Sequence, residues 1–207
     1  MVETETPARV DGRRARGDAT RRAIVRRAMQ IAAVDGLEGI SLARLAADLG
    51  MSKSGLFAHF DSKEELQLAT LRGARRFFTR HAVDPAQAEP EGLPRLRRLV
   101  DAWLTYLGEE ADAGGCLFIE GAAEYNGRTG PVRDLIADTM SRWLGLLTEQ
   151  ARIACEKGEI EADPERLAWE LHAFGLALNW DRQLYGNAAA LERARAAAAD
   201  RLRRAAA

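Results

Sequence analysis

The chain has 207 residues, a formal net charge of −1, 47% apolar residues and 29% charged residues. That length corresponds to one or two domains, and the composition is typical of an ordinary globular protein. No run of about 18 apolar residues occurs and the first 17 residues contain no apolar stretch, so we expect neither a transmembrane helix nor a secretory signal. The two cysteines are too few to form a disulfide framework. We therefore expect a cytoplasmic protein with no membrane contact.

The small net charge hides an asymmetry between the two parts of the chain. Residues 1–80 contain 15 Lys and Arg against 10 Asp and Glu, whereas residues 81–207 contain 15 against 21. A basic N-terminal part joined to an acidic remainder indicates that one end meets a polyanion such as DNA. Uneven solvated charge is the alternative interpretation.

The pattern is helical along the whole chain. Ala, Leu, Arg and Glu are abundant and β-branched residues are sparse, and no alternating strand pattern occurs. Residues 1–17 contain Pro7, Gly12 and Gly17 and are expected to form a flexible Arg-rich arm. Turn and capping residues divide the remainder into an all-α fold of about nine helices. The expected helices lie at about residues 18–34, 41–49, 52–59, 62–81, 94–110, 116–125, 131–157, 163–185 and 188–207.

The segment 41–60, SLARLAADLGMSKSGLFAHF, has the pattern of a helix-turn-helix. Ala46 supplies a small residue where the two helices cross, and Gly50 tolerates the positive φ that the turn needs. Apolar residues stand where the helices bury their shared face: Leu45, Leu49, Met51 and Leu56. The second of the two helices presents short or basic residues outward, which lets its backbone approach a major groove: Lys53, Ser54, Gly55, Ala58 and His59. An ordinary helical hairpin is the alternative.

Serines mark the helix starts in this region. Ser41 and Ser52 stand where they can cap the two helices of the motif. Ser62 and Glu65 have the spacing of a capping box, in which each side chain accepts the free backbone N–H of the other residue.

Several short motifs lie close together between residues 20 and 71. They are Ala28 and Ala32-Ala33, then GLEGISL at 36–42, LA at 45–46, LGMSK at 49–53, LFAHF at 56–60 and SKEEL at 62–66. This segment, about a quarter of the chain, resembles the DNA-binding domain of TetR-family transcriptional regulators. The resemblance implies nine helices, with a helix-turn-helix DNA-binding domain at 18–62 and a ligand-binding and dimerisation domain at 63–207.

The resemblance also implies which residues meet DNA. Ser41 is expected to donate to a phosphate, the third helix to bring Lys53, Ser54 and Gly55 near base edges, and His59 and Lys63 to lie against the backbone. Family members commonly have Tyr at the position of Phe57, where the hydroxyl reaches a phosphate; Phe57 keeps only the packing role. The predicted DNA-binding set is Ser41, Arg44, Ser52, Lys53, Ser54, Gly55, Phe57, His59 and Lys63.

Eight arginines lie between Arg9 and Arg27. Such a segment can lie in a minor groove or along phosphates, as N-terminal arms do in other helix-turn-helix proteins. A solvated tail is the alternative, and both interpretations stay open.

In the resembled family, the C-terminal helices enclose a pocket for an inducer, and such pockets are mostly apolar with a few placed polar groups. The predicted ligand-binding set is Trp103, Tyr106, Phe118, Glu124, Tyr125, Trp143, His172, Asn179 and Trp180. Core packing is the alternative for each aromatic residue and for His172. Glu120 and Glu124 are four residues apart, and an inducer with a donor or a cation suits whichever of them faces inward.

The last two expected helices match the dimer elements of the family. Small residues on the first of these helices are expected to permit close approach to a second copy: Ala168, Ala173, Gly175 and Ala177. A homodimer places two recognition helices about one DNA turn apart, which is what reading a palindrome requires.

These observations predict a sequence-specific DNA-binding transcriptional regulator, a repressor that a partly apolar small-molecule inducer releases from a palindromic double-stranded operator. One alternative is a DNA-binding regulator controlled by a protein partner, which bulky packing without a cavity in the C-terminal domain favours. Another is a helical enzyme or carrier whose helix-turn-helix no longer works, supported by Phe57 alone. No catalytic residues, metal ligands or cofactor motif are recognisable, so no enzyme, metal site or cofactor is predicted.

Overall fold

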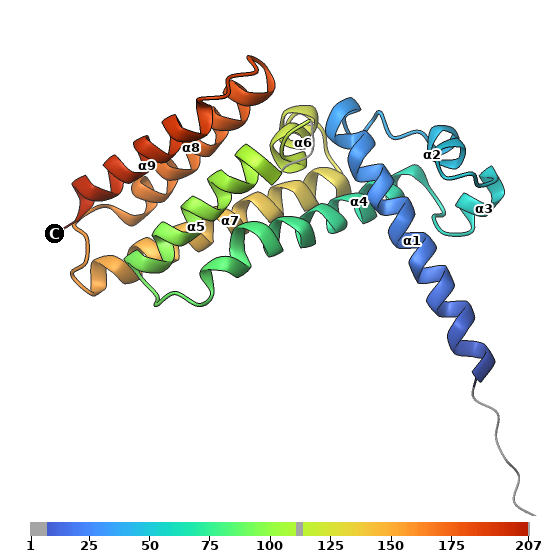
Figure 1. Cartoon of the computed structure of the whole chain (residues 1–207), viewed down its shortest axis with the longest axis horizontal. Helices are drawn as coiled ribbons and strands as arrows, with labels where there is room; N and C mark the ends of the chain where they lie inside the picture. The colour runs from blue at the N-terminus through green and yellow to red at the C-terminus, as the bar shows by residue number, and fades with distance from the viewer. Residues whose placement is uncertain (1–7, 111–113, 207) are drawn as a thin grey trace, which may run out of the picture.

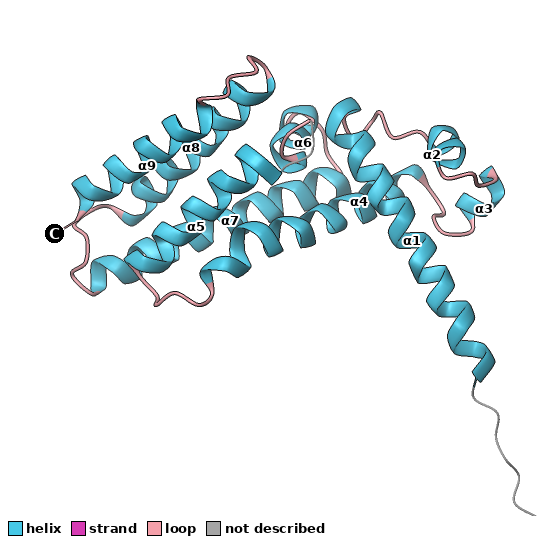
Figure 2. Cartoon of the chain, viewed as in Figure 1, coloured by secondary structure: helices cyan, strands magenta, loops and turns pink. Residues whose placement is uncertain are grey.

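The computed structural model describes residues 8–110 and 114–206, and within these ranges the regular elements are helical (Figures 1 and 2). The α-helices are α1 (Ala8–Asp35), α2 (Leu42–Asp48), α3 (Lys53–Phe57), α4 (Lys63–Phe78), α5 (Leu93–Thr105), α6 (Leu117–Tyr125), α7 (Pro131–Glu156), α8 (Pro164–Gln183) and α9 (Ala190–Ala205). Short helical extensions follow α4 and α5: η1 (Thr79–Val83), η2 (Asp84–Ala86) and η3 (Tyr106–Glu110). The expectation of an all-α fold of about nine helices is thus confirmed for the described residues.

Helix α1 is longer than the sequence predicts. It begins at Ala8, so residues 8–17, which were expected to form an arm, are helical, and residues 1–7 of that arm lie outside the described residues. Gly12 and Gly17 each disfavour helix by about 1 kcal/mol relative to Ala, but a single glycine does not have to end a helix. The surrounding Ala and Arg residues are good helix formers, which accounts for the difference.

Helices α1 to α3 enclose a small apolar core. Ile24, Ile31, Leu45, Leu56 and Phe60 are each at most 1% exposed. The turn between α2 and α3 is closed by a hydrogen bond of 2.8 Å from the Met51 N–H to the Ala46 carbonyl oxygen. Gly50 adopts a φ of 63° in this turn, the left-handed conformation expected for it.

The predicted helix caps are present, with one difference of register. The hydroxyl oxygens of Ser52 and Ser62 accept the N–H groups of Gly55 and Glu65, each at 3.0 Å. The Glu65 carboxylate, however, accepts the N–H of Asp61 at 2.7 Å rather than that of Ser62. The box therefore closes one residue earlier than its spacing predicts.

Helix α4 connects the N-terminal helices to the rest of the molecule. It packs on α1 at one end and on α7 further along, and α5 to α9 complete a layered C-terminal bundle in which α8 and α9 form the outer layer (Figure 1). Buried side chains form one continuous core that runs through both parts. Within the described ranges, no helix is long and apolar enough to cross a bilayer.

Candidate DNA-binding and regulatory sites

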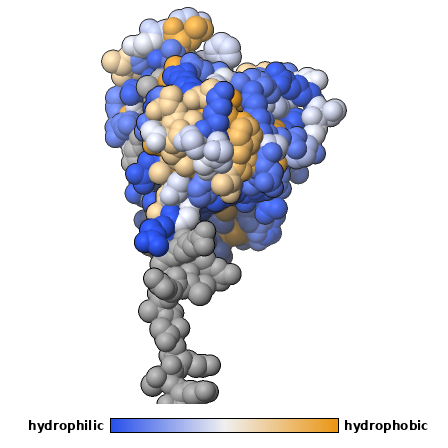
Figure 3. Space-filling view, turned by 90° about the vertical axis from the view of Figure 1, so that its right-hand side faces the viewer, coloured by the Kyte–Doolittle hydropathy of each residue, from blue (hydrophilic) through white to orange (hydrophobic). Residues whose placement is uncertain are grey.

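The end of the molecule that carries α2 and α3 presents the residues predicted to meet DNA. Lys53 and Ser54 are exposed at the start of α3, and Gly55 is half-buried behind them. Phe57 is 46% exposed, an unusual position for a large apolar side chain. Figure 3, which looks onto this end, shows hydrophobic surface surrounded by hydrophilic surface. The arrangement offers a cation, a hydroxyl and a flat apolar contact on one short helix.

Other predicted DNA contacts are held by neighbouring protein groups. Arg44 forms an ion pair with Asp35. The Lys63 ammonium donates to the Glu38 carbonyl oxygen at 2.7 Å and lies 2.9 Å from the Glu38 carboxylate. The Ser41 hydroxyl accepts the Arg44 N–H at 3.4 Å, and the His59 carbonyl oxygen accepts from Arg21. Arg44 and Lys63 therefore have protein partners that compete with a phosphate for their N–H donors.

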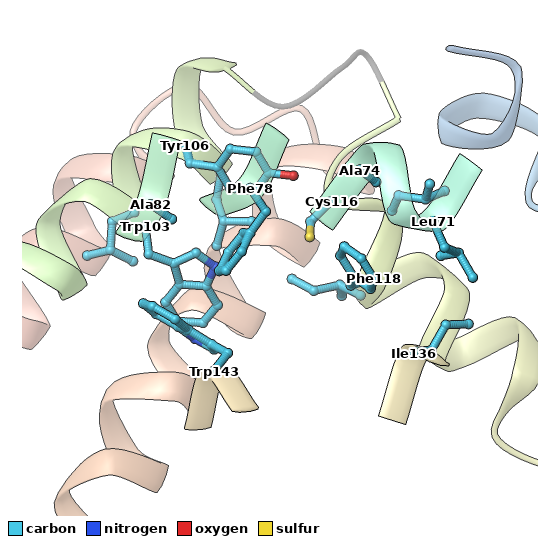
Figure 4. Close-up of a cluster of buried hydrophobic side chains, with 14 of the residues drawn as sticks. Leu71, Ala74, Phe78, Ala82, Trp103, Tyr106, Cys116, Phe118, Ile136 and Trp143 are labelled. Atoms are coloured by element: carbon cyan, nitrogen blue, oxygen red, sulfur yellow. The ribbon is translucent and has the colours of Figure 1, made fainter. Parts of the chain in front are cut away.

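Four of the nine predicted ligand-binding residues surround one small cavity between α5, α6, α7 and α8. These are Trp103, Phe118, Trp143 and His172, and the cavity has a volume of about 20 Å³, the size of a single water site. Figure 4 shows the rings of Trp103 and Trp143 packed together with that of Phe78. Trp103 lies 5.2 Å from Trp143 and stacks on His172 at 5.3 Å, measured between ring centroids. In this conformation, side chains fill the space that a ligand requires.

The polar groups beside this cavity are few. The indole Nε1 of Trp143 is buried and has no hydrogen-bond partner among the described residues. Burial lowers the pKa of His172, which keeps its imidazole neutral near pH 7. Burial also raises the pKa of the Cys116 thiol, which disfavours the reactive thiolate.

The remaining predicted ligand residues lie elsewhere. Tyr106 packs edge-on against Phe78 at 5.5 Å beside the cavity rather than in its wall. Asn179 is buried, accepts the Cys116 N–H at 3.2 Å and donates to Glu120 at 2.8 Å. Trp180 is 57% exposed, because it comes directly after Asn179 on α8 and points about 100° away from it.

Glu124 and Tyr125 lie at the junction with the DNA-binding domain and not at the cavity. The Glu124 carboxylate accepts the N–H groups of Leu37 and Glu38, at 2.8 and 2.9 Å. The Tyr125 hydroxyl donates to the Glu38 carboxylate at 2.8 Å. The buried Gln67 amide donates to Tyr125 at 3.1 Å and to the Leu37 carbonyl oxygen at 3.0 Å. We refer to Leu37, Glu38, Gln67, Glu124 and Tyr125 as the α6 latch, because they fasten the end of α6 to the loop between α1 and α2.

The electrostatics of the latch favour a charged Glu38. Hydrogen bonds from Lys63 and Tyr125 lower the pKa of Glu38 from 4.5 to about 2. Burial, followed by the neighbouring Glu38 carboxylate, raises the pKa of Tyr125 and keeps its hydroxyl protonated. Gly36 stands beside the latch with a φ of 77°, and a Cβ there would lie 3.0 Å from a Glu124 carboxylate oxygen. A side chain at this position would conflict with both the backbone and the latch.

Sequence reasoning missed part of both sites. The cavity wall also includes Phe78, Ile119, Thr139 and Met140. Leu37, Glu38 and Gln67 were assigned no role at the junction. Their partners lie 58 to 87 residues further along the chain, and helical spacing gives no signal for a contact between helices so far apart.

The outer face of α8 and the turn that follows it expose large apolar side chains. Trp169, Trp180, Leu184 and Tyr185 are between 57% and 71% exposed. Of the small residues expected to face a second copy, Ala168 is fully buried, and a Cβ on Gly175 would lie 2.3 Å from the Trp103 ring. These two therefore pack inward, whereas Ala177 is exposed between Trp169 and Trp180.

Both parts of the chain match known families. Residues 24–70 match the family model of bacterial regulatory proteins of the tetR family, and residues 92–198 match that of the tetracyclin repressor-like C-terminal domain. No curated protein matches significantly.

Solved structures share the fold over most of their length. A TetR transcriptional regulator from Chloroflexus aurantiacus J-10-FL aligns with a TM-score of 0.85 at 23% identity, over 93% of this chain and 98% of that one. A transcriptional regulator from Saccharomonospora viridis in complex with choline aligns with a TM-score of 0.76 at 23% identity, over 88% and 95%. AibR, in complex with isovaleryl coenzyme A and operator DNA, aligns with a TM-score of 0.66 at 24% identity, over 77% and 85%.

Proposed function

This chain belongs to the TetR family of transcriptional regulators, and we propose that it is a repressor which a small molecule releases from a palindromic operator. The observation that carries the proposal is the position of α6. The first residues of this helix line the cavity, and its last residues form the latch to the DNA-binding domain. A movement at one end of a nine-residue helix is transmitted to the other end, because the helix is held at both.

For operator binding, we propose that α3 enters the major groove. Lys53, Ser54 and Gly55, at the start of α3, are the proposed contacts to base edges. The proposed phosphate contacts are Ser41, Arg44, Ser52, His59 and Lys63. Phosphate contacts position a protein on DNA, and base contacts specify the sequence. The exposed ring of Phe57 offers an apolar contact to a sugar or a thymine methyl group.

For assembly, we propose a homodimer through α8 and α9. The exposed face of α8 carries Trp169 and Trp180, and its C-cap residue Leu184 follows; the spacings of 11 and 4 residues place the three on one side of the helix. An exposed apolar stripe of this kind marks a protein interface. We expect Trp180→Glu to convert a dimer into a monomer in sedimentation experiments, and Arg142→Glu on α7 to leave the dimer unchanged.

For the ligand, we propose a largely apolar molecule with a hydrogen-bond acceptor. Two solved relatives hold isovaleryl coenzyme A and choline, so related folds accommodate quite different molecules. Here the cavity wall is largely aromatic. The Nε1–H of Trp143 has no partner among the described residues and can donate a hydrogen bond to an acceptor on the ligand. Because the cavity holds about 20 Å³, the ligand has to select a conformation in which the cavity is open.

The same closed cavity favours one alternative, in which a protein partner rather than a small molecule controls release from DNA. Tight packing of Trp103, Trp143 and His172 is what a domain without a ligand requires. Under this alternative, the exposed surface carries the signal and the cavity is an ordinary core.

The testing experiment is selection of fragmented genomic DNA by the purified protein, followed by affinity measurements across a range of salt concentrations. We expect a palindrome whose log K falls linearly with log salt, and a loss of about tenfold or more in operator affinity for Lys53→Ala. Arg142→Ala on α7 removes one charge far from α3 and serves as the control. Weak binding that is the same for every sequence would contradict the proposed operator recognition.

A panel of apolar acceptor-bearing compounds then separates the two modes of control. Release of the operator by one of them, weakened in Trp143→Phe, supports the small-molecule mode. Retained operator binding with every compound favours the partner-controlled alternative.

A further inference from the structure

A second hollow of the molecule lies outside both the recognition helix and the aromatic cavity. It is an open groove of about 690 Å³ between α1 and α4. The two helices approach closely at Gly73, where a Cβ would lie 2.7 Å from the Val25 side chain and 3.1 Å from the Met29 sulfur. Val25, Met29 and Phe77 provide an apolar floor. The volume is in the range of sites that hold small molecules.

The walls of the groove are two rows of arginine. Arg22 and Arg26 follow one another at four-residue spacing on α1, and Arg72, Arg76 and Arg80 do the same on α4 and its extension. All five side chains are exposed. Like charges at this spacing disfavour a helix, so the rows oppose the stability of both helices.

These arginines also lack the carboxylate partners that many other arginines of the protein have. In the described part of the chain, no carboxylate lies within ion-pair distance of any of the five, and Glu65 acts on Arg72 only at longer range. Arg152 on α7, by contrast, has Glu149 and Glu156 beside it. Among the described residues that line the groove, Asp18 is the one that is acidic.

We propose that this groove binds a soluble anion that carries two or more phosphate groups. A guanidinium group binds phosphate through two parallel hydrogen bonds, and rows on facing walls allow several phosphates to be held at once. The apolar floor suits a ring or an alkyl group attached to those phosphates. DNA fits less well as the source of these phosphates. From the point where it crosses α1, α4 runs away from α2 and α3, the helices proposed to meet DNA (Figure 1).

An anion in this position bridges α1, which belongs to the DNA-binding domain, and α4, which leads into the C-terminal bundle. It neutralises two rows that repel each other, and so fixes the angle between the two helices. Binding of the anion does not depend on the proposed operator function; an effect on operator affinity does.

The test is calorimetric titration of the full-length protein with inorganic tripolyphosphate, with orthophosphate as the weaker comparison. We expect Arg72→Gln/Arg76→Gln to weaken tripolyphosphate binding at least tenfold. The double variant Arg133→Gln/Arg142→Gln on α7 removes the same charge and should bind like the wild type. Arg72→Lys/Arg76→Lys keeps the charge and removes the paired hydrogen bonds, so its affinity should fall between the other two and rule out a folding defect as the cause.

Equal binding by the wild type and Arg72→Gln/Arg76→Gln would overturn the proposal, as would an equal loss in the α7 control variant. A further arm measures a duplex of random sequence by fluorescence anisotropy. If the α4 variant weakens duplex binding while tripolyphosphate fails to bind the wild type, the rows hold DNA phosphates and the proposal is wrong. If tripolyphosphate binds as expected but no operator is recovered, anion binding in the groove is supported and the proposed operator function is contradicted.

Discussion

The two ends of α6 differ in how much apolar packing holds them. At its start, Phe118 and Ile119 pack into an aromatic cluster with almost no free space, and the buried Asn179 amide adds hydrogen bonds to the Cys116 N–H and the Glu120 carboxylate. At its end, Glu124 and Tyr125 are held by hydrogen bonds of 2.8 to 2.9 Å to a loop of the DNA-binding domain. Apolar packing has little directional preference, whereas hydrogen bonds weaken steeply once their geometry is lost. When α6 is displaced, we therefore expect the hydrogen bonds at its second end to open first.

The largest effect is expected at the apolar end. Phe118→Ala removes a buried ring beside the cavity, and we expect the free energy of unfolding to fall by about 3–5 kcal/mol. Urea unfolding measures this loss, and an apolar fluorescent probe should bind the enlarged cavity. A loss below about 1 kcal/mol would mean that the cluster collapses around the missing ring.

At the polar end, Glu124→Ala leaves the N–H groups of Leu37 and Glu38 without their acceptor. We expect a loss of about 1–3 kcal/mol in the free energy of unfolding, smaller than for Phe118→Ala because water can replace a half-buried carboxylate. Operator affinity should also become less sensitive to a cavity ligand. Glu149→Ala, on the exposed face of α7, is the control; the same loss there would show that the latch has no special role.

A smaller change distinguishes the contribution of the Tyr125 hydroxyl from that of its ring. Tyr125→Phe keeps the buried ring and removes the hydrogen bond to the Glu38 carboxylate and the one from the Gln67 amide, with an expected loss of about 1–2 kcal/mol. In Glu124→Ala/Tyr125→Phe, the two losses should fail to add, because both residues hold the same loop. Simple additivity in this double-mutant cycle would contradict a cooperative latch.

The smallest expected effect is one of pH. The pKa of Glu38 is about 2 in the folded protein and 4.5 ordinarily, so its stabilising contribution is complete above about pH 4.5 and is lost as pH falls toward 2. Between pH 5 and pH 3, wild-type protein should lose more stability than Glu38→Gln, which carries no titrating group there. Parallel curves for the two proteins would exclude a charged Glu38 as part of the latch.

Features that depend on neighbouring residues could be predicted from the sequence, whereas contacts between distant segments could not. The helix-turn-helix depends on short-range features, and the caps at Ser52 and Ser62 and the turn at Gly50 were found where their neighbours in sequence predict them. The family resemblance predicted Trp103, Phe118, Trp143 and His172 to line a ligand pocket, and in the structure they line the small cavity; that this cavity binds a ligand stays a prediction.

The assignment failed where a residue's role depends on a distant segment. Glu124 and Tyr125 belong to the same short helix as Phe118, yet they meet Leu37 and Glu38 instead of the cavity. Whether a given face of a helix meets one domain or another is decided by how α6 lies between α1, α4 and α7, and local spacing does not contain that information. The closed state of the cavity is likewise a property of packing between helices.

The intrinsic fluorescence of the four tryptophans can report on the conformation of the protein. Trp103 and Trp143 lie in the aromatic cluster, at most 6% exposed, while Trp169 and Trp180 stand on the open face of α8. Indole emission shifts to longer wavelengths in water, so the two pairs emit differently. Replacement of the outer pair by Phe leaves a signal from the cavity alone, and replacement of Trp103 and Trp143 leaves a signal from the α8 face. Two such variants would allow the order of ligand entry and subunit rearrangement to be timed without any added dye.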